Sequence, residues 1–262
     1  MAYGSTNGVK IHYEISGEGY PFVLVHANPF DRRLFLYQVA HFSTFFKVIN
    51  IDLRGYGYSD RPPAPITMVD LCEDIVAVCR QEGVGEAVFA GISVGGVMGL
   101  QLGLDHPEIF KALILVGCSS QPGDRYQARI DGYMKEGVPK YHIQHLTSLV
   151  SQGFPKTRLG KYLLGMHTEM DSRLSAPAIA EIFHALQNRD LTARLPELKM
   201  PVIIMNVEFD NSLKRSQEMS TKIAGAEHHV IPGAGHACCL EDPATFDEIA
   251  LGFLKKHKFL QS

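Results

Sequence analysis

Short apolar runs along the chain alternate with segments whose apolar residues recur at helical spacing. Several runs, such as FVLV, ALILV and VIIM, are apolar at consecutive positions, which is typical of parallel strands buried on both faces. Strands that alternate with helices in this way indicate an α/β fold, a mostly parallel sheet of about eight strands with helices on both faces. The predicted strands are Val9–Ile15, Phe22–His26, Lys47–Ile51, Ala87–Ala90, Ala112–Gly117, Val202–Asn206 and His228–Ile231.

Residues typical of helix ends mark several of the helices. Thr67 and Asp70 have the spacing of a capping box and precede apolar residues at helical spacing. Residues 93–105 are predicted to form a helix that stops before a proline. Asp242 followed by Pro243 supplies an N-cap and a first-turn proline for the last helix.

The alternation of strands and helices is interrupted between residues 121 and 195. This stretch contains no strand-like run, and its apolar residues form helical stripes. We therefore expect a core domain made of 1–120 and 196–262, with a helical cap at 121–195 inserted after the sixth strand. A cap rich in Tyr, Met and Phe is suited to roof a pocket, although most of these residues should pack against one another. The stripes are Leu159, Tyr162, Leu163 and Met166, then Ile179, Ile182, Phe183 and Leu186.

Composition and charge exclude several classes of protein. The 262 residues carry a net charge of −3, and the one lysine cluster, Lys255–Lys258, is better suited to a helix C-terminus than to nucleic acid. The N-terminus lacks the apolar core of a signal peptide, and no stretch is apolar enough for a membrane span. Five cysteines without CxxC spacing suit free, packed thiols in a reducing compartment. We expect a cytoplasmic monomer or homodimer that binds neither nucleic acid nor membrane.

The run GISVGG at 91–96 is the first candidate for chemistry. A strand precedes it and a helix follows it, which is the context of a nucleophile elbow, where Gly91 and Gly95 leave room for a tight turn. Ser93 would then be a nucleophile with the Val94 amide beside it, at a helix N-terminus that favours negative charge. The alternative is that Ser93 only caps the helix.

A serine nucleophile needs a base, and the chain has twelve histidines. His236 follows the last strand in the turn IPGAGHACC, whose glycines leave the backbone free to bring an imidazole over the sheet edge. His26 ends a strand but belongs to the segment HANP. The pairs His142 with His145 and His228 with His229 suit packing or solvent better than a metal site. We predict His236 as the general base.

The base needs a carboxylate to orient it. Glu208 and Asp210 both follow the strand VIIMN, and Asp210 is favoured because it lies further out on the loop, beside Asn211. The order Ser93, Asp210, His236 is the order expected for this type of elbow.

Five segments together resemble the α/β-hydrolase superfamily over essentially the whole chain. Within it the chain is most similar to small serine-dependent esterases, lactonases and perhydrolase-like members. The segments are VHANP (25–29), DLRGYGYSD (52–60), GISVGG (91–96), VEFD (207–210) and GAGHA (233–237).

The resemblance implies a second oxyanion donor. In that family the residue before the proline of His–Gly–x–Pro donates its amide, which makes Asn28 the partner of Val94. The Asn28 side chain could also donate, as the similar asparagine does in dehalogenases. Ala27 and Val207 stand where the family usually has glycine, and the latter leaves Glu208 as an alternative acid. Aspartate-dependent dehalogenases and epoxide hydrolases are disfavoured because Ser93 occupies the nucleophile position and the chain has no Trp.

The segment DLRGYGYSD is not predicted to bind a nucleotide, because it lacks a third glycine and a following Lys-Ser/Thr. Its expected role is to shape the loop after a strand near the catalytic face.

These observations predict a hydrolase without metal or cofactor, acting on a small carboxylic ester or lactone through an acyl-enzyme. Two alternatives remain open. The same residues could hydrolyse a carbon–carbon bond or form a peracid, or the scaffold could be a ligand-binding sensor with slow chemistry.

Overall fold

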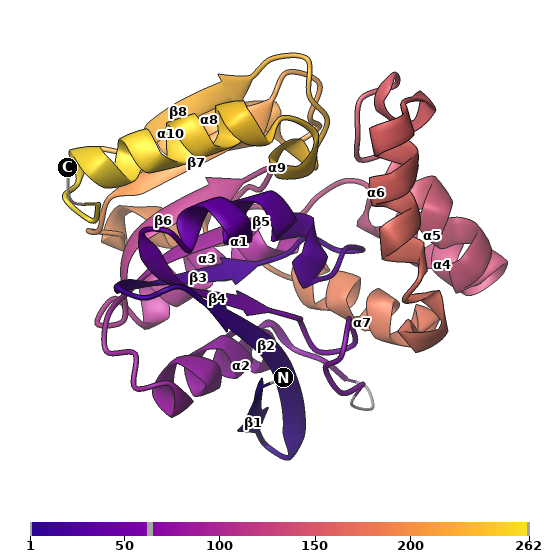
Figure 1. The fold of residues 1–262 in the computed structure, drawn as a ribbon, viewed down its shortest axis with the longest axis horizontal. Coiled ribbons are helices and arrows are strands. Elements are labelled where there is room, and N and C mark those ends of the chain that lie inside the picture. The colour runs from indigo at the N-terminus through magenta and orange to yellow at the C-terminus, as the bar shows by residue number, and fades with distance from the viewer. Residues whose placement is uncertain (1, 62–64, 261–262) are drawn as a thin grey trace.

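The computed structural model describes residues 2–61 and 65–260. Its centre is an eight-stranded sheet in the order β1-β2-β4-β3-β5-β6-β7-β8, in which β3 to β8 run parallel and β2 is antiparallel to β4 (Figure 1). This is the predicted fold class. The strands are β1 Ala2–Thr6, β2 Val9–Ser16, β3 Tyr20–Val25, β4 Phe46–Ile51, β5 Ala87–Ile92, β6 Phe110–Val116, β7 Val202–Val207 and β8 Glu227–Ile231.

All seven predicted strands are present, and β1 is an additional one. Its sequence, AYGST, has no apolar run. It is a strand because it pairs antiparallel with β2, with Tyr3 opposite His12, at the edge of the sheet. An edge strand buries little of its surface, so its sequence need not be apolar.

The order of the strands reverses beside β3. The chain passes from β3 to β4 on one side and then returns to β5 on the other side. Loops that leave the carboxyl ends of β3 and β5 therefore diverge and leave a crevice between them, which is where ligands bind in open α/β sheets.

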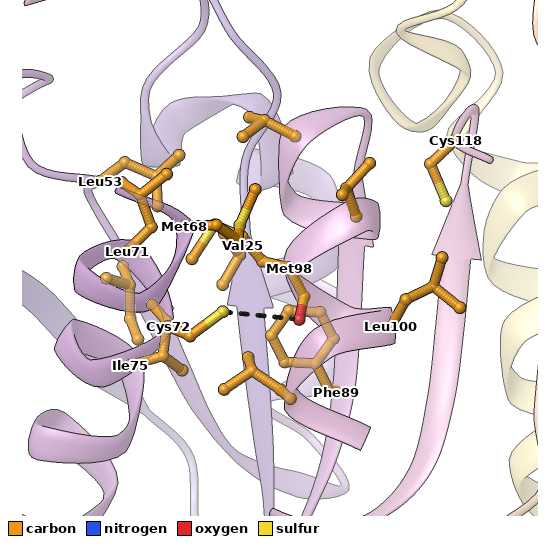
Figure 2. Packing of buried hydrophobic residues seen from close by; sticks show 14 of the residues in the cluster. Val25, Leu53, Met68, Leu71, Cys72, Ile75, Phe89, Met98, Leu100 and Cys118 are labelled. Atoms are coloured by element: carbon orange, nitrogen blue, oxygen red, sulfur yellow. Dashed lines mark hydrogen bonds between the residues drawn. The ribbon is translucent and has the colours of Figure 1, made fainter. Parts of the chain in front are cut away.

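Two helical layers bury the two faces of the sheet. In one layer, α2 (Met68–Gln81) and α3 (Val94–Asp105) pack against sheet residues such as Phe89. Figure 2 shows Cys72 of α2 beside Met98 of α3, close to the Phe89 ring. The other layer contains α1, α9 and α10. Full burial of one side chain such as Phe89 contributes about 2 kcal/mol. The helices of the layers are α1 Leu36–Phe42, α2 Met68–Gln81, α3 Val94–Asp105, α8 Leu213–Ser220, α9 Cys238–Glu241 and α10 Pro243–Lys256.

The predicted caps are present at two helices. Thr67 and Asp70 bond to each other's backbone amides at the start of α2, which is the capping box. Asp242 accepts a hydrogen bond from the Thr245 amide at the start of α10.

The chain between β6 and β7 is helical and contains no strand. Figure 1 shows its helices grouped beyond one end of the sheet. The second predicted stripe is buried, but in α6 the buried face is offset: Leu159 and Tyr162 are exposed, whereas Leu163, Leu164 and His167 turn inward. Its elements are α4 Tyr126–Glu136, α5 Val138–Thr147, η2 Phe154–Lys156, α6 Arg158–Thr168, η3 Asp171–Arg173, α7 Ala176–Gln187 and η4 Thr192–Glu197; a further short helix, η1 Arg32–Phe35, follows β3.

In the described part of the chain, no helix combines the length and apolar character that a membrane crossing requires. All five cysteines are free and buried, as predicted.

Candidate active site

A cavity of about 620 Å³ lies where the carboxyl ends of the central strands meet the helical segment that follows β6. The core contributes loop residues after β3, β5, β6, β7 and β8. The helical segment contributes residues of α4, α5 and the loop after α5. Ser93, Asn28, Asp210 and His236 all line this cavity.

Ser93 lies on a strained turn between β5 and α3. Its φ of 57° and ψ of −113° lie outside the regions that residues with a side chain normally adopt, and such a conformation costs about 1–3 kcal/mol. The turn is tight: a Cβ on Gly95 would lie 2.2 Å from the Val25 carbonyl oxygen, and one on Gly91 would lie 2.3 Å from the Gly95 carbonyl. The prediction that both flanking positions must lack bulk is therefore confirmed.

Ser93 does not cap the helix that follows it. Ser93 stands at the N-cap position of α3, yet its side chain makes no capping hydrogen bond. The α3 helix begins at Val94, whose amide belongs to the first turn and so has no partner within the helix.

Asn28 reaches the same cavity from the loop after β3. It is 4% exposed, and neither polar atom of its side chain has a hydrogen-bond partner among the described residues. A buried amide without partners is costly in a folded protein. Asn28 is therefore positioned to gain hydrogen bonds when a ligand enters.

His236 and Asp210 form a part-buried pair, with side chains 15% and 6% exposed. Nδ1 of His236 lies 2.5 Å from Oδ2 of Asp210, and the other carboxylate oxygen accepts hydrogen bonds from the amide and hydroxyl of Ser212, at 2.8 and 2.9 Å. Since Nδ1 faces a carboxylate, it carries the proton, and Nε2 is left to accept one.

The pair changes both pKa values. Burial alone would raise the pKa of Asp210, but His236 and the bonds from Ser212 outweigh it and hold that pKa at about 2. Burial alone would lower the pKa of His236, but the Asp210 carboxylate outweighs it and raises the pKa above its ordinary value. Arg129 acts in the opposite direction on the same imidazole.

Gly117, directly after β6, has no side chain and so leaves space for the His236–Asp210 pair. A Cβ at this position would lie 2.6 Å from Cε1 of His236 and 3.1 Å from Oδ2 of Asp210, and φ is +55°. Ser93 Oγ and His236 line the same cavity without a hydrogen bond between them in this structure. Such bonds are often long before substrate binds.

The alternative acid Glu208 and the histidine His26 do not line the cavity. Glu208 is exposed, whereas Asp210 is the acid that contacts His236. His26 is buried, with Nδ1 3.0 Å from the Ala27 carbonyl and Nε2 accepting the Leu53 amide at 3.0 Å.

His142 and His145 diverge from one helix. His142 contacts Asp171 at 2.5 Å, and His145 contacts the Tyr133 hydroxyl at 3.1 Å. Burial lowers the pKa of His145 well below its ordinary value. Within residues 2–61 and 65–260, no group of three or more His, Cys, Asp or Glu is arranged to hold a metal ion.

The segment DLRGYGYSD folds around the carboxylate of Asp52. That carboxylate accepts the amides of Arg32 and Tyr58, at 2.9 and 3.1 Å, and lies 2.8 Å from Nδ1 of His12. A Cβ on Gly57 would lie about 2.2 Å from it. The predicted structural role of this loop is confirmed.

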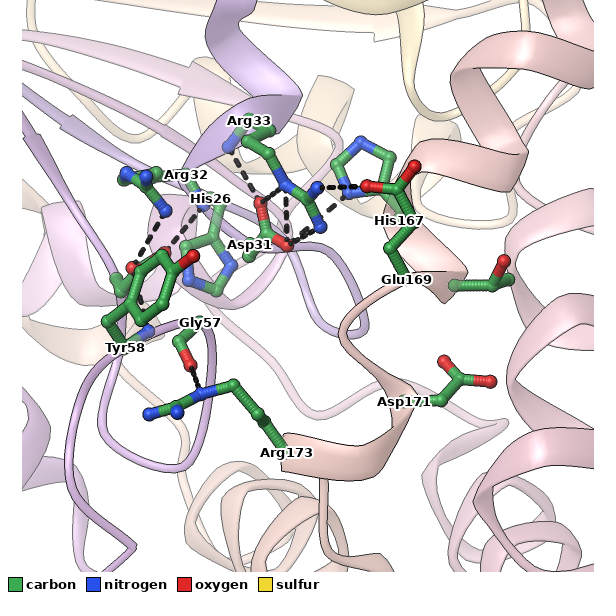
Figure 3. A network of polar contacts seen from close by, with 12 residues as sticks. His26, Asp31, Arg32, Arg33, Gly57, Tyr58, His167, Glu169, Asp171 and Arg173 are labelled. Carbon is green, nitrogen blue, oxygen red and sulfur yellow. Dashed lines mark hydrogen bonds and ion pairs between the residues drawn. The ribbon is translucent and has the colours of Figure 1, made fainter.

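A network of polar contacts joins the helical segment to the loops that follow β3 and β4 (Figure 3). Asp31 pairs with Arg33 at 2.8 Å, and Arg33 reaches Glu169 at 3.3 Å. Arg173 donates to the Gly57 carbonyl at 2.7 Å. Although burial would raise the pKa of Asp31, His167 and Arg33 hold it below its usual range. The charged form of Asp31 also accepts the Arg33 amide at 2.8 Å and so caps η1 in the loop after β3.

Among the cavity residues whose place in the site was not predicted from the sequence are Gly117, Arg129 and His145. A glycine at a strand end is a visible signal for Gly117. Arg125 and Arg129 are four residues apart and so share a helix face. The sequence does not predict that this helix face lines the cavity.

Comparison with known proteins agrees with this geometry. The chain matches the alpha/beta hydrolase fold family over residues 20–243. It is 24% identical to 3-oxoadipate enol-lactonase 2 of Acinetobacter baylyi, over 95% of this chain and 94% of that protein. The solved structure of the enol-lactonase from Burkholderia xenovorans matches with a TM-score of 0.90 at 24% identity, covering 97% of this chain and 100% of that one. Est816, described as an N-acyl homoserine lactone degrading enzyme, matches with a TM-score of 0.83 at 26% identity, covering 96% and 100%.

The fold and the comparisons together show that the protein is a hydrolase. The chain belongs to the α/β hydrolase family.

Proposed function

We propose that the protein is a serine hydrolase that cleaves a small carboxylic ester or lactone through an acyl-enzyme. The observation that carries this proposal is the convergence in one cavity of Ser93, on a strained turn, with the part-buried His236–Asp210 pair. The three residues come from separate loops, after β5, β7 and β8, so they are brought together by the fold and not by closeness in the sequence.

In the proposed first step, Ser93 Oγ attacks the substrate carbonyl while Nε2 of His236 accepts the hydroxyl proton. Asp210 keeps the other proton on Nδ1 and stabilises the imidazolium that forms. His236 then gives its proton to the leaving oxygen, and for a lactone this oxygen remains attached to the acyl chain. In the second step water attacks the acyl carbonyl while His236 takes its proton. The bond between that carbon and Ser93 Oγ then breaks, His236 returns the proton to the serine oxygen, and the acid leaves.

The backbone amides of Val94 and Asn28 are the proposed donors to the oxyanion. Val94 opens α3, so that the helix N-terminus adds favourable partial positive charge. One such donor is worth about 3–4 kcal/mol of barrier. The side chain of Asn28, buried and without partners among the described residues, can add a further hydrogen bond.

Residues 121–195 are proposed to act as a cap that sets the acyl and alcohol preference. The support is that α4, α5 and the loop after α5 supply part of the cavity wall. The names of the enol-lactonase of Acinetobacter baylyi and of the lactone-degrading Est816 favour lactones and related carboxylic esters as the substrate class.

The proposal is tested with Ser93→Ala on p-nitrophenyl butyrate. We expect kcat to fall about 10⁴-fold or more, with the thermal midpoint of unfolding unchanged, because alanine keeps the Cβ and the backbone conformation of position 93. Full retained activity in a folded Ser93→Ala protein would rule the mechanism out.

A further inference from the structure

The wall of the cavity carries more positive than negative side chains. Arg125, Arg129 and Arg215 line it, together with Asp124 and Asp210. Asp210 is bound to His236, and Asp124 is bound to Arg215, with 2.7 Å between Nη1 and Oδ2. Both carboxylates are therefore already paired.

Two of the three arginines, Arg129 and Arg215, are half-buried, and of these only Arg129 lacks an acidic partner among the described residues. It is half-buried on α4 and donates from Nη2 to Ser148 Oγ at 2.9 Å, and it forms no ion pair within residues 2–61 and 65–260. Ser148 Oγ itself donates to the His145 carbonyl at 2.7 Å, so that the hydroxyl is fixed. Arg125, one turn earlier, is exposed.

Arg129 lines the same cavity as Ser93 and His236. Its positive charge lowers the pKa of the buried His145 and opposes the effect of Asp210 on the pKa of the half-buried His236.

A partly desolvated guanidinium with unused donors is suited to a carboxylate, which it can bind through two parallel hydrogen bonds. A second carboxylate in the cavity would also balance the unpaired charge. We propose that Arg129 binds an ionised carboxyl group of the substrate, so that the substrate is an ester or lactone bearing a second, free acid group. This inference rests on the proposed hydrolase function and names its substrate class.

The test compares two esters of equal length. p-Nitrophenyl hemiglutarate ends in a carboxylate, and p-nitrophenyl valerate ends in a methyl group. We expect the native protein to prefer the hemiglutarate by about 10- to 100-fold in kcat/KM, the range of one charged hydrogen-bonded contact. Arg129→Gln should bring the two esters close to parity, by raising KM for the hemiglutarate and leaving the valerate within about 3-fold.

Arg80→Gln is the matched control. It removes the same charge from α2, where Arg80 is 66% exposed and lies outside the cavity lining, and should leave the preference unchanged. Equal kcat/KM for both esters in the native protein, or the same loss of preference in both variants, would overturn the inference.

A binding measurement separates this inference from the proposed chemistry. Glutarate should raise the unfolding temperature of the Ser93→Ala protein and not that of the Ser93→Ala/Arg129→Gln protein. Equal stabilisation of both proteins, or of neither, would contradict a carboxylate site at Arg129. Activity retained by Ser93→Ala would instead contradict the serine mechanism.

Discussion

At the scale of single residues, the pair formed by Asp210 and His236 sets the pH range of the proposed reaction. His236 can accept a proton only as the neutral imidazole, and its pKa lies above the ordinary value because the effect of Asp210 exceeds that of burial. The value of kcat/KM should therefore rise with pH, with a midpoint above about 6.5.

Asp210→Asn should lower kcat about 10³- to 10⁴-fold, because the amide no longer fixes the tautomer or stabilises the imidazolium. The midpoint of the pH profile should also move to lower pH, since the group that raises the pKa of His236 is gone. Glu208→Gln, on the exposed neighbour of the same loop, is the control and should match the native profile. A larger loss in Glu208→Gln than in Asp210→Asn would show that the acid has been assigned to the wrong residue.

The side chains for this chemistry were predictable because each follows a strand. Ser93, Asp210 and His236 each follow a predicted strand, and the carboxyl ends of parallel strands lie at one edge of the sheet. Arg129 was not predictable in the same way, because its role depends on the orientation of α4, and tertiary packing determines that orientation.

At the scale of elements, the close approach of β6 to the loop after β8 positions His236, the proposed base. Gly117 allows this approach, since a methyl group there would lie against the imidazole.

Gly117→Ala should therefore displace His236 and lower kcat about 100-fold or more, the effect of a misplacement of about 1 Å. Gly83→Ala is the matched control, because Gly83 also has a positive φ, of 65°, but a Cβ there would meet nothing within 4 Å. The control should lose about 1–2 kcal/mol of stability, which lowers the unfolding temperature by about 2–8 °C, and keep its activity. Equal activity in both variants would mean that Gly117 is needed only for its positive φ and not to make space for His236.

Local sequence signals predicted the helix ends better than the helix faces. The capping box at Thr67 and Asp70 is present because capping depends on neighbouring residues. In α6 the buried face is offset from the apolar stripe, since Gly160 packs against the Phe154 carbonyl and His167 against Phe30. The strand β1 went unpredicted because pairing with β2, and not its own pattern, makes it a strand.

At the scale of the whole molecule, two buried layers hold the sheet without any disulfide among the five cysteines. Burial raises the pKa of the thiols of Cys79 and Cys238 to about 12.

The native protein should therefore leave all five thiols unreactive toward Ellman's reagent at neutral pH, because thiolate is the reactive form and all five lie in the interior. After denaturation all five should react. A reducing agent should leave the unfolding temperature unchanged. Rapid reaction of a thiol in the folded protein would show that the packing around it opens.

The central claim is that Ser93 is the nucleophile, and a fluorophosphonate tests it most directly. The reagent is incubated with the native protein, the residual esterase activity is followed, and the adduct is located by mass spectrometry. We predict one adduct per chain, on the peptide that carries Ser93, formed in step with the loss of activity. An adduct on Ser119, Ser148 or Ser151, which line the same cavity, or full activity with Ser93 modified, would contradict the account.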